Sequence, residues 1–258
     1  MLLNAKVAAI EFRGDEIRAA VIKTGGRPTV LELQSARAVY TDPEQRFEAM
    51  VLAAETALDA LKSGPAAYIY CADCHNSIVR GLTVPFRGQR RVAAAVLFEL
   101  DHYLAIPIEE LLLDFTTVGE AGGETDVLAM GLRRAQLEQD LAILEAVGVE
   151  PDAVTLDVVA MTALWQTHTK TTKGLNAVLH LREGGASLAI THNKKLAYLR
   201  GLNATAASMT ENPVAAAREV QNTLRAFLAQ CREDAEITQL HITGTHGTPE
   251  TLAPFTEE

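Results

Sequence analysis

The run of residues most suggestive of chemistry is Cys71-Ala-Asp-Cys74-His75, which matches the string that attaches a c-type haem. Haem is attached in this way on exported chains, and the first residues show no export signal. A zinc site would need a second pair of ligands, and the nearest histidines in sequence do not have a ligand-like spacing. A redox role remains open, although no obvious helix begins at the motif. We interpret the run as the end of a strand and a hinge between domains.

The other reactive residues do not form a grouping that spacing alone assigns to catalysis, and we expect no catalytic residues and no metal site. His241 and His246 flank Thr-Gly-Thr, which indicates a turn. The formal net charge is -10 and the pI is about 5.2. Phosphate contacts require a basic surface, so this charge argues against a nucleic-acid partner.

Length and composition indicate a globular chain with aliphatic cores. The 258 residues are 48% hydrophobic but only 5% aromatic, enough for about two or three small cores. We find no signal peptide and no apolar run of about 18 residues. The 3 cysteines fit a reducing cytoplasm. The chain stops soon after the last expected strand, so we expect either a shortened chain or a membrane segment after Glu258.

The elements that must position these residues occur twice in the same order. Each copy predicts three strands, a helix and a fourth strand, and in each copy the first two strands meet at a glycine turn. The first copy comprises strands 6–12, 16–22 and 29–33, helix 43–61 and strand 67–71. The second copy comprises strands 175–181, 186–191 and 195–200, helix 213–231 and strand 237–242.

A block with its own pattern separates the two copies. It predicts a βαββα unit that could bury one helix-covered sheet face by itself. Its elements are strand 77–84, helix 89–104, strands 111–118 and 125–131, and helix 134–147. A further helix, 155–168, returns to the first copy. We therefore expect a first lobe of residues 1–75 and 152–170, an insert of residues 76–151, and a second lobe of residues 171–258.

This order resembles the actin-like cell-division protein FtsA, and more closely PilM of type IV pilus assembly and the cytoplasmic domain of GspL of type II secretion. The segments that carry the resemblance are residues 80–85, 98–107, 111–115, 144–157 and 240–247. It implies an actin-like α/β fold with duplicated RNase H-like lobes, 1A and 2A. The insert takes the place of subdomain 1C. A 2B-type subdomain is not expected, because only one helix is predicted between the third and fourth strands of the second copy.

The resemblance also implies where a nucleotide site would lie. In nucleotide-binding members the two hairpins carry aspartates, which hold Mg²⁺ through water, and glycines, which let the backbone approach phosphates. Here the second hairpin has His180 in place of the carboxylate and Arg182 in place of the first glycine. Arg182 could pair with a phosphate directly or be an exposed hairpin residue. The residues that correspond to the site are Glu11, Gly14, Asp15, Asp157, Arg182, Gly184, Gly185, Gly244 and Gly247.

The altered loops favour a non-catalytic scaffold at the cytoplasmic face of the inner membrane, in a pilus or secretion machine. The resemblance implies a PilN- or GspM-like membrane partner, a secretion ATPase as second partner, and a possible homodimer. A partner peptide is expected in a groove near Arg80, Val84 and Phe86. The alternative is an actin-like ATPase that uses ATP and holds Mg²⁺ through Glu11, Asp15 or Asp157. An adaptor unrelated to secretion is a third possibility.

Overall fold

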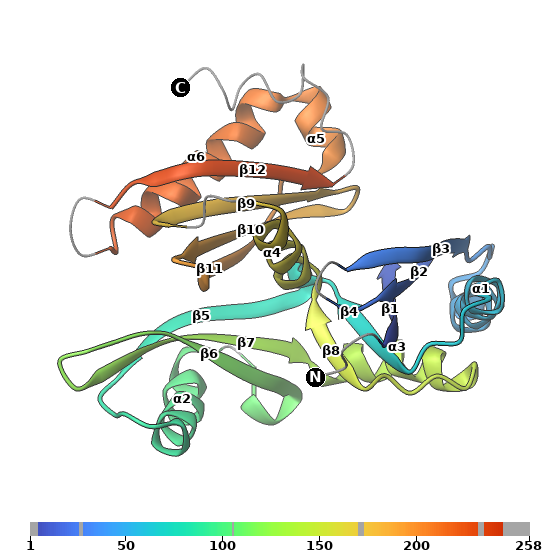
Figure 1. Ribbon diagram of the computed structural model, residues 1–258, viewed down its shortest axis with the longest axis horizontal. Helices are drawn as coiled ribbons and strands as arrows, with labels where there is room; N and C mark the ends of the chain where they lie inside the picture. The colour runs from blue at the N-terminus through green and yellow to red at the C-terminus, as the bar shows by residue number, and fades with distance from the viewer. Residues whose placement is uncertain (1–4, 26–27, 105, 170–172, 232–234, 245–258) are drawn as a thin grey trace. The chain divides into compact units, whose positions relative to one another are not determined.

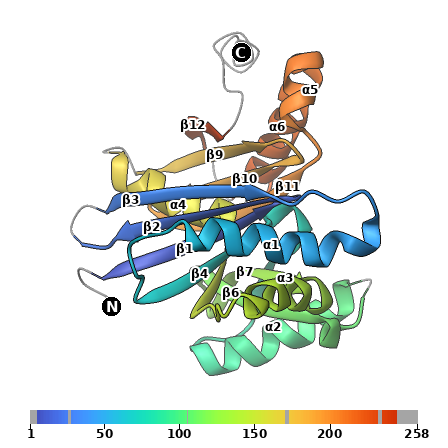
Figure 2. The same cartoon turned by 90° about the vertical axis from the view of Figure 1, so that its right-hand side faces the viewer.

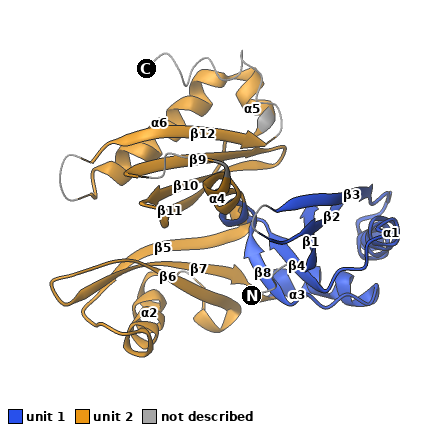
Figure 3. Ribbon diagram, in the orientation of Figure 1, with its two compact units in different colours: residues 1–73, 135–160 blue, residues 74–134, 161–258 orange. Residues whose placement is uncertain are grey.

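Both copies of the repeated pattern form the strands that their sequences predict. The computed structural model describes residues 5–25, 28–104, 106–169, 173–231 and 235–244. The chain divides into two units (Figure 3), residues 1–73 with 135–160 and residues 74–134 with 161–258. The insert strands thus group with the second copy in one unit.

The first unit is built on a five-stranded sheet with the order β3-β2-β1-β4-β8 (Figure 1). The first three strands are antiparallel, and β4 and β8 continue the sheet in parallel. Apolar residues alternate along β1 and β2, so Ala8, Ile10 and Ile17 all face a core with 0% exposure. The strands are β1 Lys6–Arg13, β2 Glu16–Lys23, β3 Thr29–Arg37, β4 Ala67–Ala72 and β8 Ala153–Leu156.

Helix α1 (Arg46–Asp59) packs against β2 and β3 (Figure 2). It follows a 3₁₀ turn, η1 (Pro43–Gln45), whose start is capped by Asp42, because Oδ1 of Asp42 accepts a hydrogen bond from the amide of Glu44 at 3.0 Å. The buried residues of α1 have the spacing of one helical face and are Met50, Ala53, Ala54 and Ala57. Helix α3 (Arg134–Ala146) ends before Gly148, whose φ of 74° is that of the C′ glycine expected from the sequence.

In the second unit, the second copy forms a four-stranded sheet with the order β11-β10-β9-β12. In copy order this is third-second-first-fourth, the same as the β3-β2-β1-β4 part of the first sheet. The fourth strand is again parallel to the first, as expected for a duplicated unit. The strands are β9 Leu175–Arg182, β10 Gly185–His192, β11 Lys195–Leu202 and β12 Ile237–Gly244.

The expectation of one helix between β11 and β12 is wrong, because α5 (Ala206–Glu211) precedes α6 (Pro213–Leu228). A capping box begins α5: Thr205 Oγ1 accepts from the Ser208 amide at 3.0 Å, and Ser208 Oγ accepts from the Thr205 amide at 2.8 Å. The side chain of Asn212 then caps α6 by accepting from the Ala215 amide at 3.2 Å.

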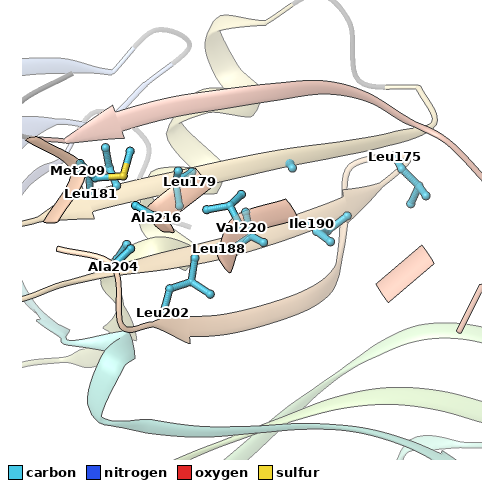
Figure 4. Packing of buried hydrophobic residues seen from close by; sticks show 12 residues of the cluster. Leu175, Leu179, Leu181, Leu188, Ile190, Leu202, Ala204, Met209, Ala216 and Val220 are labelled. Atoms are coloured by element: carbon cyan, nitrogen blue, oxygen red, sulfur yellow. The ribbon is translucent and has the colours of Figure 1, made fainter. Parts of the chain in front are cut away.

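The two helices cover one face of this sheet and close its core (Figure 4). The core is aliphatic, as the composition predicts, and its strand residues alternate along β9 and β10. Leu179, Leu188 and Ile190 are each 0% exposed and meet Ala216 and Val220 from α6. Strand β9 is buried along its whole length, on both faces.

The insert forms a three-stranded antiparallel sheet with the order β5-β7-β6, covered on one face by α2 (Figure 1). Its core joins Val84 and Val127 of the sheet to Val92, Val96 and Leu100 of the helix. The elements are β5 Ser77–Val84, α2 Gln89–Tyr103, β6 Leu111–Ala121 and β7 Glu124–Arg133, and the 3₁₀ turns η2 Cys74–Asn76 and η3 Ile108–Glu110.

One strand was not predicted. Residues 153–156 form β8, which pairs in parallel with β4, and helix α4 (Asp157–His168) begins only after it. The expected helix 155–168 is thus two residues too long at its start. Within the described part of the chain, no helix has both the length and the apolar character needed to span a bilayer.

Candidate functional site

Two of the expected site carboxylates lie together in the first unit, around the thiol of Cys71. Strands β1, β4 and β8 run in parallel, and their pairing places Glu11 beside Cys71 and Cys71 beside Thr155. Asp157 follows β8 directly as the first residue of α4. Ligands of α/β sheets commonly bind at the carboxyl ends of such strands.

The electrostatics at this edge do not favour a reactive thiol or an Mg²⁺ site. Burial raises the pKa of Cys71 to about 11, and the negative charges of Glu11 and Asp157 contribute. The thiol is therefore protonated at neutral pH and is a poor nucleophile. Arg13 Nε donates to Glu11 Oε1 at 2.9 Å, so that carboxylate is already engaged in an ion pair. Asp157 is only 5% exposed, and its Oδ1 accepts from the Val158 amide at 2.6 Å.

Magnesium prefers several open oxygen ligands in octahedral geometry. The residues at this edge are a carboxylate that is ion-paired with an arginine, a buried carboxylate and a thiol. This set of ligands fits Mg²⁺ poorly. Among the residues that the structure describes, no group of three histidine, cysteine, aspartate or glutamate side chains could hold a metal ion.

The turn of the first hairpin is held in place by hydrogen bonds from the side chains of Tyr40 and Arg46. Gly14 takes a φ of 61° in the two-residue turn between β1 and β2. Asp15 Oδ1 accepts from the Tyr40 hydroxyl at 3.0 Å and from Arg46 Nε at 3.2 Å. Arg46 Nη2 also donates to the carbonyl of Gly14 at 3.2 Å. Asp15 therefore ties the turn to the segment that leads into α1.

The second hairpin buries the residues that replace the expected acid and glycine. His180 is 2% exposed and Arg182 is 6% exposed, and strand alternation places both on the face of β9 opposite the core with α6. The expectation that Arg182 is an exposed hairpin residue is wrong, because β9 is covered on both faces. An arginine is thus packed at the end of the strand, where the resemblance expects a glycine.

Gly185 has a packing role that requires no phosphate. The ring of His75, from η2, lies against β10 and β11 where two glycines leave room for it. A Cβ atom on Gly185 would lie 3.2 Å from His75 Nδ1, and one on Gly201 would lie 3.1 Å from His75 Cα. Both distances are tighter than ordinary contacts, so these glycines admit the histidine.

Gly244 is explained by a close approach between backbones. It ends β12 with a φ of 110° and pairs with Leu181 of β9. A Cβ atom at this position would overlap the carbonyl oxygen of Leu181. Gly184, in contrast, has open space around it. Gly247 lies outside the described residues.

The three residues expected in a peptide groove have different environments. Arg80 is exposed, and its Nη1 donates to the carbonyl of Val79 at 2.9 Å. Phe86 is 44% exposed, and its carbonyl accepts from Thr125 Oγ1 at 2.7 Å. Val84 is fully buried against α2. The expectation that it lines a peptide groove is therefore wrong.

A groove of about 700 Å³ in the second unit contains Arg80, but neither Val84 nor Phe86 of the expected peptide groove. Its walls come from η2, β5 and β11. Sequence patterns could not join Arg80 to the β11 wall, because the residues that form the groove are far apart in the chain. Arg200 and Gly201, which no motif marks, are two of them.

The repeated strand order, with a third small sheet between the copies, defines an actin-like fold. Neither a protein-family model nor a curated protein sequence matches the chain. Solved structures do match. One is a Bacteroides thetaiotaomicron protein of unknown function with an actin-like ATPase fold: TM-score 0.55, 11% identity, 98% of this chain and 88% of that one.

Two further solved structures superpose on the chain with higher TM-scores. A chain of a PilM–PilN type IV pilus biogenesis complex superposes with a TM-score of 0.78 at 16% identity, over 98% of this chain and 84% of that one. The cytoplasmic domain of EpsL, an inner-membrane component of the type II secretion system of Vibrio cholerae, gives 0.58 at 14% identity, over 93% and 82%. The predicted resemblance to this group is confirmed as a likeness of fold.

Proposed function

We propose that this chain is a non-catalytic scaffold in the inner-membrane assembly platform of a type IV pilus or type II secretion machine. The observation that carries the proposal is the likeness, over nearly the whole chain, to a chain of a PilM–PilN complex. The similar EpsL domain is the cytoplasmic domain of an inner-membrane component of a type II secretion system.

The environments of the candidate nucleotide-site carboxylates support a role without catalysis. Glu11 is ion-paired to Arg13, Asp15 is bonded to Tyr40 and Arg46, and Asp157 is buried. ATP hydrolysis would need open oxygen ligands for Mg²⁺ and backbone amides free to approach phosphates.

The proposed partners are a PilN- or GspM-like inner-membrane protein, a cytoplasmic secretion ATPase and a second copy of the chain, as a homodimer. In this role the chain works at the cytoplasmic face of the membrane. We place the membrane partner's peptide beside Phe86, whose ring is the exposed apolar group after β5. A half-exposed aromatic ring is the kind of anchor that contributes most to peptide affinity.

Replacing Phe86 with alanine is expected to weaken binding of this peptide about tenfold, or about 1.4 kcal/mol. The probe is a synthetic peptide with the cytoplasmic sequence of the PilN- or GspM-like protein encoded in the same genome, titrated by calorimetry. The matched control is Phe98→Ala, which removes a ring that is 66% exposed on α2. Equal losses in both variants would reject the site, and absence of binding to the unmodified chain would reject the partner.

A further inference from the structure

The groove in the second unit lies beside the outermost strand of the four-stranded sheet. It has a volume of about 700 Å³, within the range of ligand-binding pockets. Residues 198–201 of β11 form one wall and residues 77–81 of β5 form the other. His75, Leu128 and Gln230 complete the lining.

Strand β11 offers an unused edge to this groove. It ends the sheet order, and among the described strands it pairs only with β10. Among the described residues no backbone hydrogen bond uses its other edge, which η2 and the insert strands approach, so the amides and carbonyls there can pair with a strand added in the groove. The four residues that line the groove would span about 13 Å of extended chain.

Gly81 leaves open space in the groove where a second backbone would approach. A Cβ atom placed on Gly81 would meet nothing within 4 Å, so the space beside this part of β5 is open. Gly201 on the opposite wall leaves no such space, because the backbone and ring of His75 fill it. Glycine inside a strand commonly marks a place where another backbone comes close.

The charges of the groove favour an acidic occupant. Arg80 and Arg200 are both exposed, and no acidic residue lines the groove. Within the described part of the chain, neither arginine forms an ion pair with a carboxylate. Arg80 instead donates to the carbonyl of Val79 on its own strand. The chain as a whole carries a net charge of -10, so this cationic groove is opposite in sign to the whole chain.

We propose that the groove binds an extended acidic segment of a partner protein, which adds to β11 as a fifth strand and places carboxylates on Arg200 and Arg80. Main-chain pairing along β11 supplies affinity, and the two guanidinium groups select acidic side chains by charge-assisted hydrogen bonds. The site does not include Phe86 and does not depend on the scaffold role proposed above.

A displayed library of random peptides about nine residues long, a typical strand length, tests the proposal on the intact chain. Selected peptides are expected to be enriched in aspartate and glutamate at alternate positions. They are expected to be depleted in proline where the backbone nitrogen faces β11, because proline has no N–H to donate there. Arg200→Glu is expected to weaken binding of a selected peptide about tenfold or more, and added salt is expected to weaken it further.

Two controls separate this site from general attraction to positive charge. Arg218→Glu on α6 makes the same charge change at an exposed arginine outside the groove and is expected to leave binding unchanged. Proline scanned through the centre of a selected peptide is expected to abolish binding to the unmodified chain at positions whose amide faces β11, and to weaken it less at the positions between them. Selection of neutral or basic peptides, no selection at all, or equal binding to the Arg200→Glu and Arg218→Glu variants would overturn the proposal. No selection at all would mean that the arginines protect an edge strand from pairing, and selection of neutral or basic peptides would mean that the arginines do not choose the occupant.

Discussion

Replacing Leu188 with alanine is expected to lower the free energy of unfolding of the second unit by about 3 kcal/mol. Leu188 is fully buried in the centre of β10, and its side chain fills the core between the sheet and α6 (Figure 4). The substitution removes apolar contacts and leaves a cavity, and both effects destabilise the folded state.

Urea unfolding followed by the fluorescence of Trp165, the only tryptophan and a residue of the second unit, measures this change. The matched control is Leu97→Ala on α2, where the side chain is 49% exposed. That variant is expected to lose less than about 1 kcal/mol, because about half of the removed surface is already in water. Similar losses in the two variants would contradict the assigned core.

Alanine at Gly244 is expected to destabilise the pairing of β12 with β9 by about 2 kcal/mol or more. The φ of 110° is strained for any residue with a side chain, and the new methyl group would overlap the Leu181 carbonyl. The chain can accept alanine only if the end of β12 moves away from β9. Amide hydrogen exchange of β9 and β12 reports that movement directly.

Gly184→Ala is the matched control for this prediction. Gly184 is also an expected phosphate-loop glycine, but nothing lies within 4 Å of a Cβ atom built there. Its substitution is expected to change stability by less than about 1 kcal/mol. Unchanged exchange of β12 in the Gly244→Ala variant would show that the close approach to Leu181 is not required.

The order of elements could be read from the sequence because most strands have clear alternation and end at glycine or polar turns. Strand β8 could not, since four residues carry too little pattern and gain their structure by pairing with β4. Helix α5 was missed although Thr205 and Ser208 form a capping box. The box uses serine where the common pattern has glutamate or glutamine, which hides the signal.

The site was harder to predict than the fold. The resemblance placed Glu11 and Asp157 in one site, and the structure brings both beside Cys71. Arg13 lies two residues from Glu11 on the same face of β1, so strand alternation alone could have suggested that ion pair. The burial of Arg182 could not be predicted, because it depends on neighbours fixed by tertiary packing. The groove beside β11 needs residues 77–81 and 198–201 together, and local sequence patterns do not report such long-range contacts.

We propose that the chain keeps an actin-like fold without nucleotide chemistry. Thermal unfolding with millimolar Mg²⁺-ATP tests this most directly. A site filled at one hundred times its dissociation constant would add about 2.7 kcal/mol to the stability. In a chain of this size that would raise the Tm by about 5 to 10 °C. We expect no shift. A shift of this size that is lost in Asp157→Asn would contradict the claim and identify an active nucleotide site.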